Sequence, residues 1–390
     1  MHNHSIFGQM LQLFSRHDFK KCTDRYSGDY YTKKLNCWQQ LMLLLYAQAK
    51  GLKSLRDIES SIKNYRSRWY HIGIDSACKS TLGDANKLRS ADIFRDYFYE
   101  FLGKCREISP KHGFKFKNPF YTMDSTLISL CLSIFPWAKY RKQKGALKIH
   151  MLLDQNGTIP SFLTVTDGKC HDINIVRDPK YGFPAIEPDS IIAVDRAYID
   201  FRWLSSLDKR GITFVTRAKD NLDYMPAGQH KADKKKGILS DTSITLGGFY
   251  SFQTFQSELR LIKYKDKETG KVLMFLTNNF RLSATTIAAI YKARWQIELF
   301  FKWIKQNLKI KTFLGTSENA VLTQIWAAMI YYLMLAFIKF QTKYSFSLLD
   351  LTRTVKDLLM EPISLIEILR LKYDKFYKPL KPPDIQLAFL

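Results

Sequence analysis

PFYTMDSTLISL, residues 119–130, begins a part of the chain in which apolar and β-branched residues form short runs. Such runs, bounded by turn residues, are typical of β-strands. LKIHMLLD (147–154) and TIPSFLTVTD (158–167) have the same character, and the turn QNG separates them. Together the three runs predict a three-strand meander.

Further along, helical and strand patterns alternate. A short helical segment around residues 171–181 leads to the strand SIIAVD (190–195), and a helix near residues 197–210 leads to the strand ITFVTR (212–217). Three strands followed by alternating helix and strand predict an α/β fold, a mixed sheet flanked by helices.

Residues 1 to about 110 carry a helical pattern, with apolar residues at helical spacing in FGQMLQLF (7–14) and CWQQLMLLLYAQ (37–48). SLRDIESSI (54–62) and STLGDANKLRS (80–90) each begin with a serine that could cap a helix. Two readings stay open: a compact module that recognises DNA ends, and a plain helical packing domain.

Between Arg217 and Leu282 the alternation stops. A basic loop, HKADKKKGI (230–238), is followed by runs that predict a β-rich insertion: SITL, FYSFQTF, ELRLIKYK and KVLMFLTNN.

AVLTQIWAAMIYYLMLAFI, residues 320–338, is about long enough to cross a bilayer. Thr323 and Gln324 interrupt it, and the rest of the chain is highly basic. We therefore expect a central helix that is buried on all sides.

The charge of the chain points to its partner. Sixty Lys and Arg against 36 Asp and Glu give a net charge of +24, which favours polyanions and above all double-stranded DNA. Basic runs at 139–148, 231–236, 302–311 and 372–381 are spread along the chain, which suits a long duplex better than a small ligand. Each run alone could be a solvated face.

The cysteines and the N-terminus bear on the compartment. Six scattered cysteines contain no CxxC pair, which fits reduced thiols rather than a disulfide frame or a zinc site. MHNHSIFGQM lacks a basic segment followed by a long apolar run, so no secretion signal is expected. We expect a cytoplasmic protein associated with the nucleoid.

Two aspartates lie where a sheet of this kind usually carries catalytic groups. Asp124 is within the first predicted strand, and Asp195 ends SIIAVD. A carboxylate among apolar neighbours loses hydration unless it is paired or binds a metal. Each aspartate alone could instead cap the next helix.

A third carboxylate comes from YKARWQIELFFKWIKQNLKI, residues 291–310, which predicts one helix. At about 100° per residue, Tyr291, Arg294, Glu298 and Lys305 share one narrow stripe. The opposite flank is apolar: Ile290, Ala293, Ile297, Phe300, Phe301, Ile304 and Leu308. The stripe is either a solvated face with an ion pair, or a site where Glu298 binds a cation beside an anion such as a phosphate.

Three carboxylates that meet at one site suit Mg²⁺, with Mn²⁺ as a substitute, because these ions prefer oxygen ligands. Two such ions could share Asp124, Asp195 and Glu298. That chemistry is phosphodiester cleavage or strand transfer.

On these residues the chain resembles the bacterial DDE transposases of the insertion sequence 4 family. Their Y-x2-R-x3-E-x6-K pattern matches Tyr291, Arg294, Glu298 and Lys305, and their two aspartates match Asp124 in MDST and Asp195 in VDRAY. TVTDGKCHD (164–172) and FVTRAK (214–219) also look like family segments.

The resemblance implies a ribonuclease H-like catalytic core and a cut-and-paste reaction at terminal inverted repeats, with hairpin ends as one possible intermediate. It implies that Asp124, Asp195 and Glu298 are catalytic and bind two Mg²⁺ ions, with Asp124 bridging both. Tyr291, Arg294 and Lys305 would bind DNA phosphates, and the enzyme would act as a homodimer on its DNA.

The sequence predicts this division: an N-terminal helical domain (1–112), a catalytic core in two parts (113–218 and 282–345), a β-rich insertion (219–281) and a helical tail (346–390). Two other functions remain open at this point. One is a structure-specific nuclease that cuts without joining, and the other is a domesticated DNA-binding protein that no longer cuts.

Overall fold

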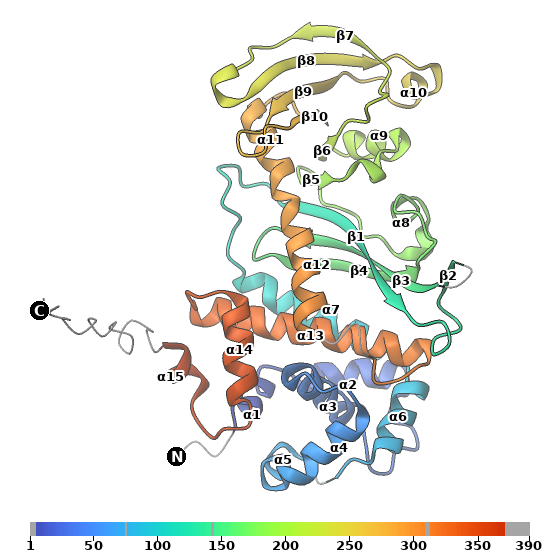
Figure 1. Cartoon of the computed structure of the whole chain (residues 1–390), viewed down its shortest axis with the longest axis vertical. Helices are drawn as coiled ribbons and strands as arrows, with labels where there is room; N and C mark the ends of the chain where they lie inside the picture. Colours follow the sequence, from blue (N-terminus) through green and yellow to red (C-terminus); the bar gives the residue numbers. More distant parts are fainter. Residues whose placement is uncertain (1–4, 75, 142–143, 309–312, 371–390) are drawn as a thin grey trace, which may run out of the picture.

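The computed structural model describes residues 5–74, 76–141, 144–308 and 313–370 (Figure 1). The basic run 372–381 lies outside these ranges, as do residues 309–310 of the predicted helix and part of the runs at 139–148 and 302–311.

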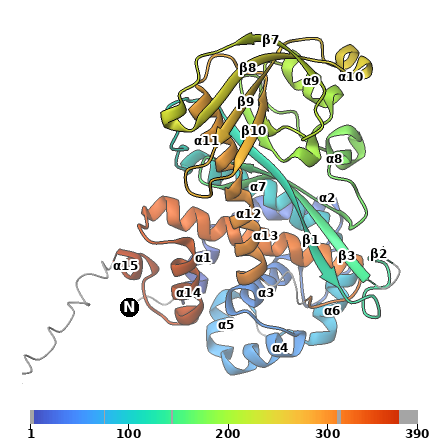
Figure 2. The ribbon, with the colours of Figure 1, turned by 45° about the horizontal axis from the view of Figure 1, so that its top comes forward.

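The sheet is built around β1 (Phe120–Leu130), and in the described ranges it has ten strands. β3 (Lys144–Asp154) pairs antiparallel with β1, and β4 (Ile159–Asp167) pairs antiparallel with β3, so the predicted meander is confirmed. A short strand, β2 (Lys139–Arg141), borders β3. In Figure 2 the long strands β1 and β3 run side by side towards β2.

On its other side β1 is parallel to β5 (Ile191–Val194), which is parallel to β6 (Thr213–Arg217). The five strands lie in the order β4-β3-β1-β5-β6. β3 is antiparallel to the other four, which all run in the same direction. This mixed sheet with flanking helices is the α/β, ribonuclease H-like arrangement that the resemblance implied.

The predicted β-rich insertion is present and continues the same sheet beyond β6. Its strands β7 (Tyr224–Gln229), β8 (Ile238–Leu246), β9 (Leu259–Lys265) and β10 (Val272–Thr277) pair antiparallel in sequence order, and β10 pairs with β6. The run FYSFQTF, which was predicted to be part of the β structure, instead forms helix α10 (Phe249–Thr254). Phe249 and Tyr250 are exposed and only Phe255, after the helix, anchors the run in the core, so aromatic content alone did not make a strand.

The region before residue 110 is helical, as predicted: α1 (Ile6–Leu11), α2 (Arg16–Arg25), α3 (Cys37–Lys50), α4 (Leu55–Asn64), α5 (Arg66–Ile72), α6 (Lys79–Leu88) and α7 (Asp92–Ile108). Ser54 caps α4 and forms a capping box with Asp57, which confirms one predicted start. The helix start predicted at Ser80 was wrong. α6 begins at Lys79, so Ser80 lies inside the first turn and does not cap the helix.

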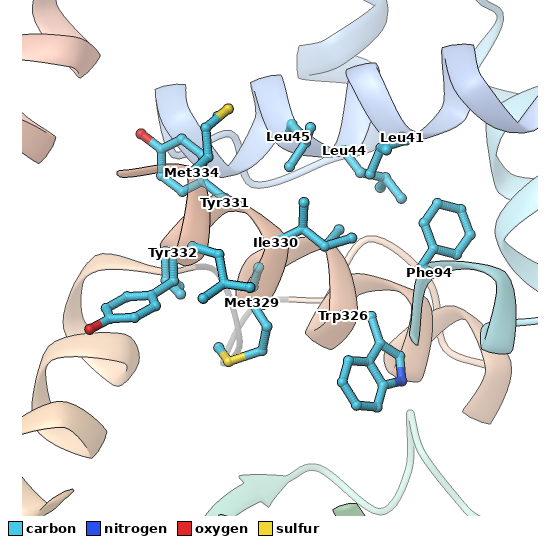
Figure 3. Close-up of a cluster of buried hydrophobic side chains, with 14 of the residues drawn as sticks. Leu41, Leu44, Leu45, Phe94, Trp326, Met329, Ile330, Tyr331, Tyr332 and Met334 are labelled. Atoms are coloured by element: carbon cyan, nitrogen blue, oxygen red, sulfur yellow. The ribbon is translucent and has the colours of Figure 1, made fainter. Parts of the chain in front are cut away.

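The apolar helix α13 (Glu318–Thr342) is a core helix, as predicted, since 89% of its most apolar window is buried. It lies between the N-terminal helices and the sheet (Figure 1). Figure 3 shows its side chains packed against those of α3 and α7, among them Ile330, Leu44 and Phe94. α14 (Leu348–Leu358) and α15 (Leu365–Arg370) follow it. The predicted domain boundaries stay a prediction.

The two faces of the sheet are covered by different helices. α11 (Ala284–Ala293) and α12 (Trp295–Asn307) cover one face, and α8 (Asn174–Arg177) and α9 (Phe201–Lys209) lie on the other. Successive residues of a strand point to opposite faces. Phe120, Ile191 and Ala193 pack in one cluster with α11, whereas Met123 and Val194 pack in another with α9.

A buried ion pair ties the insertion to the start of α11. Arg260 on β9 and Asp241 on β8 make two hydrogen bonds, of 2.8 and 2.7 Å, and their side chains are 7% and 2% exposed. Arg260 Nη1 also donates to the carbonyl oxygens of Asn279 and Leu282, at 3.2 and 2.6 Å. These bonds hold the loop from which α11 begins.

Asp241→Ala should destabilise the chain by about 3–5 kcal/mol, because it leaves the Arg260 guanidinium buried without its counter-charge. Urea unfolding followed by tryptophan fluorescence would measure the loss. The double variant Asp241→Ala, Arg260→Met should recover part of it, since it removes the uncompensated charge. A loss below about 1 kcal/mol for the single variant would contradict a structural role for the pair.

Candidate active site

The two aspartates lie next to each other because of the register of β1 and β5. The last parallel pair is Met123 with Val194, and Asp124 and Asp195 are the next residues on their strands. Met123 and Val194 pack on the face covered by α9, and successive side chains of a strand point to opposite faces. The side chains of Asp124 and Asp195 therefore lie on the face covered by α11 and α12. β5 ends at Val194 while β1 continues, which opens the sheet at this point.

The third carboxylate comes from α12, and here the structure corrects the prediction of one continuous helix. α11 ends at Ala293, α12 begins at Trp295, and Arg294 is the junction. The bonds from Arg294 N to Tyr291 O and from Ile297 N to Arg294 O, both 3.1 Å, span three residues rather than four. Such a tightened turn changes the direction of the chain slightly. The apolar flank predicted for this segment is buried, except that Ala293 is half-buried.

Arg294 connects two of the three carboxylates. Its Nη1 lies 2.8 Å from Asp124 Oδ2, and its Nη2 lies 2.5 Å from Glu298 Oε1. The Arg294 side chain is only 11% exposed, so the guanidinium lies inside the site rather than on a solvated face. The ion pair of the first interpretation is therefore present between Arg294 and Glu298, but its guanidinium is mostly buried and not solvated.

The environment of Asp124 disfavours its negative charge. The pKa of its carboxyl is raised to about 6. Burial is the main cause, and the carboxylates of Asp195 and Glu298 add to it, whereas the Arg294 guanidinium and the Ser125 N–H act in the opposite direction. Asp124 Oδ1 accepts that N–H at 2.8 Å. Asp195 and Glu298 are therefore both near enough to Asp124 to act on its charge.

Of the other residues of the predicted stripe, Tyr291 packs beside Arg294, whereas Lys305 lies further along α12. The Tyr291 ring packs on Phe275, with ring centroids 4.8 Å apart, and the Arg294 guanidinium carbon lies 5.7 Å from the centre of the tyrosine ring. Burial raises the pKa of Tyr291. Lys305 lies on α12, half-buried, two turns beyond Glu298. A cavity of about 510 Å³ beside Asp195 is lined by Arg196, Ala197, Lys219, Asp220 and Asn221.

The donor set fits a divalent cation. Asp124 and Glu298 already share one cation, the Arg294 guanidinium, and carboxylate oxygens are the ligands that hard metal ions prefer. In the part of the chain that is described, no three His, Cys, Asp or Glu side chains converge closely enough to hold a metal ion, and Arg294 lies between Asp124 and Glu298. A metal ion would therefore have to compete with Arg294.

One group of residues beside the site was not singled out from the sequence. Ser125, Lys148, His150 and Asp172 converge behind Asp124 on the other face of the sheet. Asp172 lies in TVTDGKCHD, which was noted only as a family segment. Two adjacent polar residues in a strand, Asp124 and Ser125, place one polar side chain on each face of the sheet. This pattern could have predicted a polar group behind Asp124.

Comparison with known proteins identifies the family. A family model described as the transposase DDE domain matches residues 115–334, more than half of the chain and all three carboxylates. The chain belongs to the transposase DDE domain family. It is a DNA transposase, an enzyme that cuts DNA strands and transfers them, and DDE transposases generally use divalent metal ions. A second model, a domain of unknown function (DUF4372), matches residues 2–75.

Curated relatives agree with this family. A putative transposase, y4zB, of Sinorhizobium fredii (strain NBRC 101917 / NGR234) is 32% identical over 258 residues, which cover 65% of this chain and 69% of that protein. A probable transposase for insertion sequence element IS5377 of Geobacillus stearothermophilus is 29% identical, over 68% of each chain. A putative transposase for insertion sequence element IS4SA of Synechocystis sp. (strain ATCC 27184 / PCC 6803 / Kazusa) is 28% identical, over 75% of this chain and 80% of that protein.

Among solved structures, a piggyBac transposase synaptic complex with hairpin DNA aligns with 98% of this chain and 87% of its own. The TM-score is 0.42 and the sequence identity is 12%.

The raised pKa of Asp124 predicts a pH-dependent stability difference for Asp124→Asn without divalent metal. The folded-state pKa of about 6 lies above the value of about 3.9 for an unfolded aspartate, so folding favours the protonated carboxyl. That contribution is complete below about pH 4 and is lost as the pH rises through 6. Asparagine stays neutral, so the variant should gain roughly 1.4 kcal/mol relative to wild type between pH 5 and pH 8.

Urea unfolding in EDTA at several pH values would measure this difference. Asp24→Asn on α2, whose side chain is exposed, is the control for the loss of one carboxylate. If the stability difference between Asp124→Asn and wild type did not change between pH 5 and pH 8, Asp124 would not be held in a desolvated, carboxylate-rich site.

Proposed function

We propose that this transposase serves an insertion sequence, and that Asp124, Asp195 and Glu298 are its catalytic carboxylates and its ligands for Mg²⁺. The observation that carries this proposal is the placement of Asp124 and Asp195 on one face at adjacent strand positions, with Glu298 joined to Asp124 through Arg294. Names of two relatives, each a transposase for an insertion sequence element, support the substrate.

Two Mg²⁺ ions, replaceable by Mn²⁺, would supply a metal-activated nucleophile and stabilise the leaving oxygen of the phosphodiester. The protein contributes three carboxylates in fixed positions. Asp195 and Glu298 both act on the charge of Asp124, which supports Asp124 as the ligand that two ions would share. Asp195 would bind one of the two ions, and Glu298 would bind the other.

Arg294, Lys305 and Tyr291 are proposed to hold the DNA phosphates next to the cut. A guanidinium binds a phosphate with the same paired donors that it gives a carboxylate. If Asp124 and Glu298 held metal ions, the two donors that Arg294 gives them would be available to a phosphate. Lys305 adds a second cation along the same helix, and the Tyr291 hydroxyl adds a neutral donor.

The DNA is proposed to be the terminal inverted repeats of the element and its target. The net charge of +24 supports contacts with many phosphates along a duplex. Excision by cut-and-paste, with or without hairpin ends, would place two ends in one complex, and a homodimer would supply one site to each end. The enzyme would act on the nucleoid in the cytoplasm.

Asp124→Ala, Asp195→Ala and Glu298→Ala are each expected to reduce metal-dependent cleavage of element ends at least 100-fold, because each removes a ligand of the metal ions. DNA binding, measured by fluorescence anisotropy in EDTA, should stay within about threefold of wild type, since the basic surface is unchanged. Glu59→Ala on α4 is the control, because among the described residues that carboxylate forms its ion pair with Lys63, at 3.9 Å, outside the proposed site. Cleavage by Glu298→Ala near the wild-type rate would refute the proposed triad.

Arg294→Gln should have opposite effects on metal binding and on cleavage. Without DNA, removal of the guanidinium frees Asp124 and Glu298, so Mn²⁺ should bind roughly tenfold more tightly, about 1.4 kcal/mol. Cleavage should fall, because a phosphate contact is lost.

Mn²⁺ binding would be measured by electron paramagnetic resonance of the free ion. Arg196→Gln, which removes a cation next to Asp195 that pairs with Asp220 at 3.7 Å, controls for net charge. Unchanged or weaker Mn²⁺ binding in Arg294→Gln would show that Arg294 and the metal do not compete.

A further inference from the structure

A polar cluster lies directly behind Asp124, on the opposite face of the sheet. Tyr121 and Met123 pack with Leu204 of α9, whereas Ile128 and Leu130 pack with side chains of α12 and α13. Odd-numbered residues of β1 therefore face α9, and even-numbered ones face α12. Asp124 belongs to the second set, and Ser125 to the first.

Asp172, in the loop before α8, is the centre of this cluster. Its Oδ1 accepts a hydrogen bond from Ser125 Oγ at 2.6 Å and lies 2.7 Å from Lys148 Nζ. Lys148 on β3 also donates to the carbonyl oxygen of Cys170 at 3.1 Å. One carboxylate oxygen thus ties two strands of the sheet, β1 and β3, to one loop.

Two buried polar groups adjoin Asp172. His150 is opposite Ser125 on β3, and its Nδ1 lies 3.5 Å from Asp172 without a hydrogen-bond partner among the described residues. Burial lowers the pKa of His150 to about 4, so its ring is neutral at pH 7. Because Ser125 bonds to the carboxylate and not to the imidazole, the three residues do not form a nucleophile–base chain.

Tyr198 is the second buried group. Its hydroxyl has no partner among the described residues, and its ring is fully buried three positions after Asp195. Burial raises the pKa of Tyr198, and the carboxylates of Asp172, Asp124 and Asp195 add to the effect. Tyr198 thus lies near both aspartates of the site and the cluster behind them.

The cluster lies where the sheet itself stops fixing the two aspartates. Pairing of β1 with β5 ends at Met123 and Val194, one residue before Asp124 and Asp195. A buried charge pair is weak evidence for stability, because apolar residues of similar volume can stabilise as well. Its better attested use is to specify one geometry, and here the geometry is that of β1 beside Asp124.

We propose that Asp172 is a positioning residue that fixes Asp124 relative to Asp195 through Ser125 and Lys148. This inference rests on the proposed function of the three carboxylates. Asp172 does not touch the reacting atoms. It holds the hydroxyl of the residue that follows Asp124, so that the carboxylate in front stays in place when metal ions bind.

The test uses the full chain and the metal alone. Ser125→Ala and Asp172→Asn should each weaken Mn²⁺ binding without DNA about tenfold, and raise the Mn²⁺ concentration for half-maximal cleavage by the same factor, as loss of outer ligands does in other metal sites. Ser125→Thr keeps the hydroxyl and should restore both values. Asp178→Asn, which removes a carboxylate paired with Lys180 on the same face, should leave both at wild-type values.

The outcomes separate this inference from the function on which it rests. If Asp124→Ala and Asp195→Ala abolish Mn²⁺ binding while Ser125→Ala and Asp172→Asn stay within twofold of wild type, the positioning role is refuted and the triad stands. If Ser125→Thr is as weak as Ser125→Ala, the hydroxyl is not the relevant group, and the role is refuted too. If the triad variants bind Mn²⁺ normally, the proposed function fails.

Discussion

The parallel pairing of β1 with β5 is the constraint on which the site depends. Two strands in parallel register present residues of the same face at the same height, so Met123 opposite Val194 brings Asp124 beside Asp195. Pairing ends there, because the chain after β5 turns into a short helix, whereas β1 continues beside β3 to Leu130. The end of this pairing is thus both the origin of the site and its least constrained point.

Arg294 offsets the electrostatic cost of that placement. Burial raises the pKa of Asp124, and repulsion from the carboxylates of Asp195 and Glu298 adds to this effect. The guanidinium between Asp124 and Glu298 neutralises part of the charge and fixes α12 relative to β1. Much of the core lies elsewhere: α13, buried among the N-terminal helices and the sheet, contributes more residues to the main buried cluster than any other described helix.

The sequence predicted what local patterns determine. Alternating apolar runs located β1, β3, β4, β5 and β6, and the position of Asp124 and Asp195 on or after strands followed from the same patterns. The helical pattern placed Arg294 and Glu298 on one stripe. It could not show that Arg294 also contacts Asp124, because these two residues are 170 positions apart in the sequence. The break at Arg294 and the helix at FYSFQTF were missed because the apolar and aromatic pattern of a segment does not by itself decide its conformation. The Asp172 cluster likewise joins residues that are distant in sequence.

The insertion explains how Glu298 returns to the sheet after so long an interval. Because β10 pairs with β6, the last inserted strand ends beside the core sheet, and the loop held by Arg260 turns the chain directly into α11. α11 then packs on β5 and β6, and α12 passes β1. An insertion that extended away from the sheet would leave the start of α11 unsupported. The antiparallel extension of the sheet is therefore part of what positions the third carboxylate, and changes within it that disturb β10 should act on the site through α11.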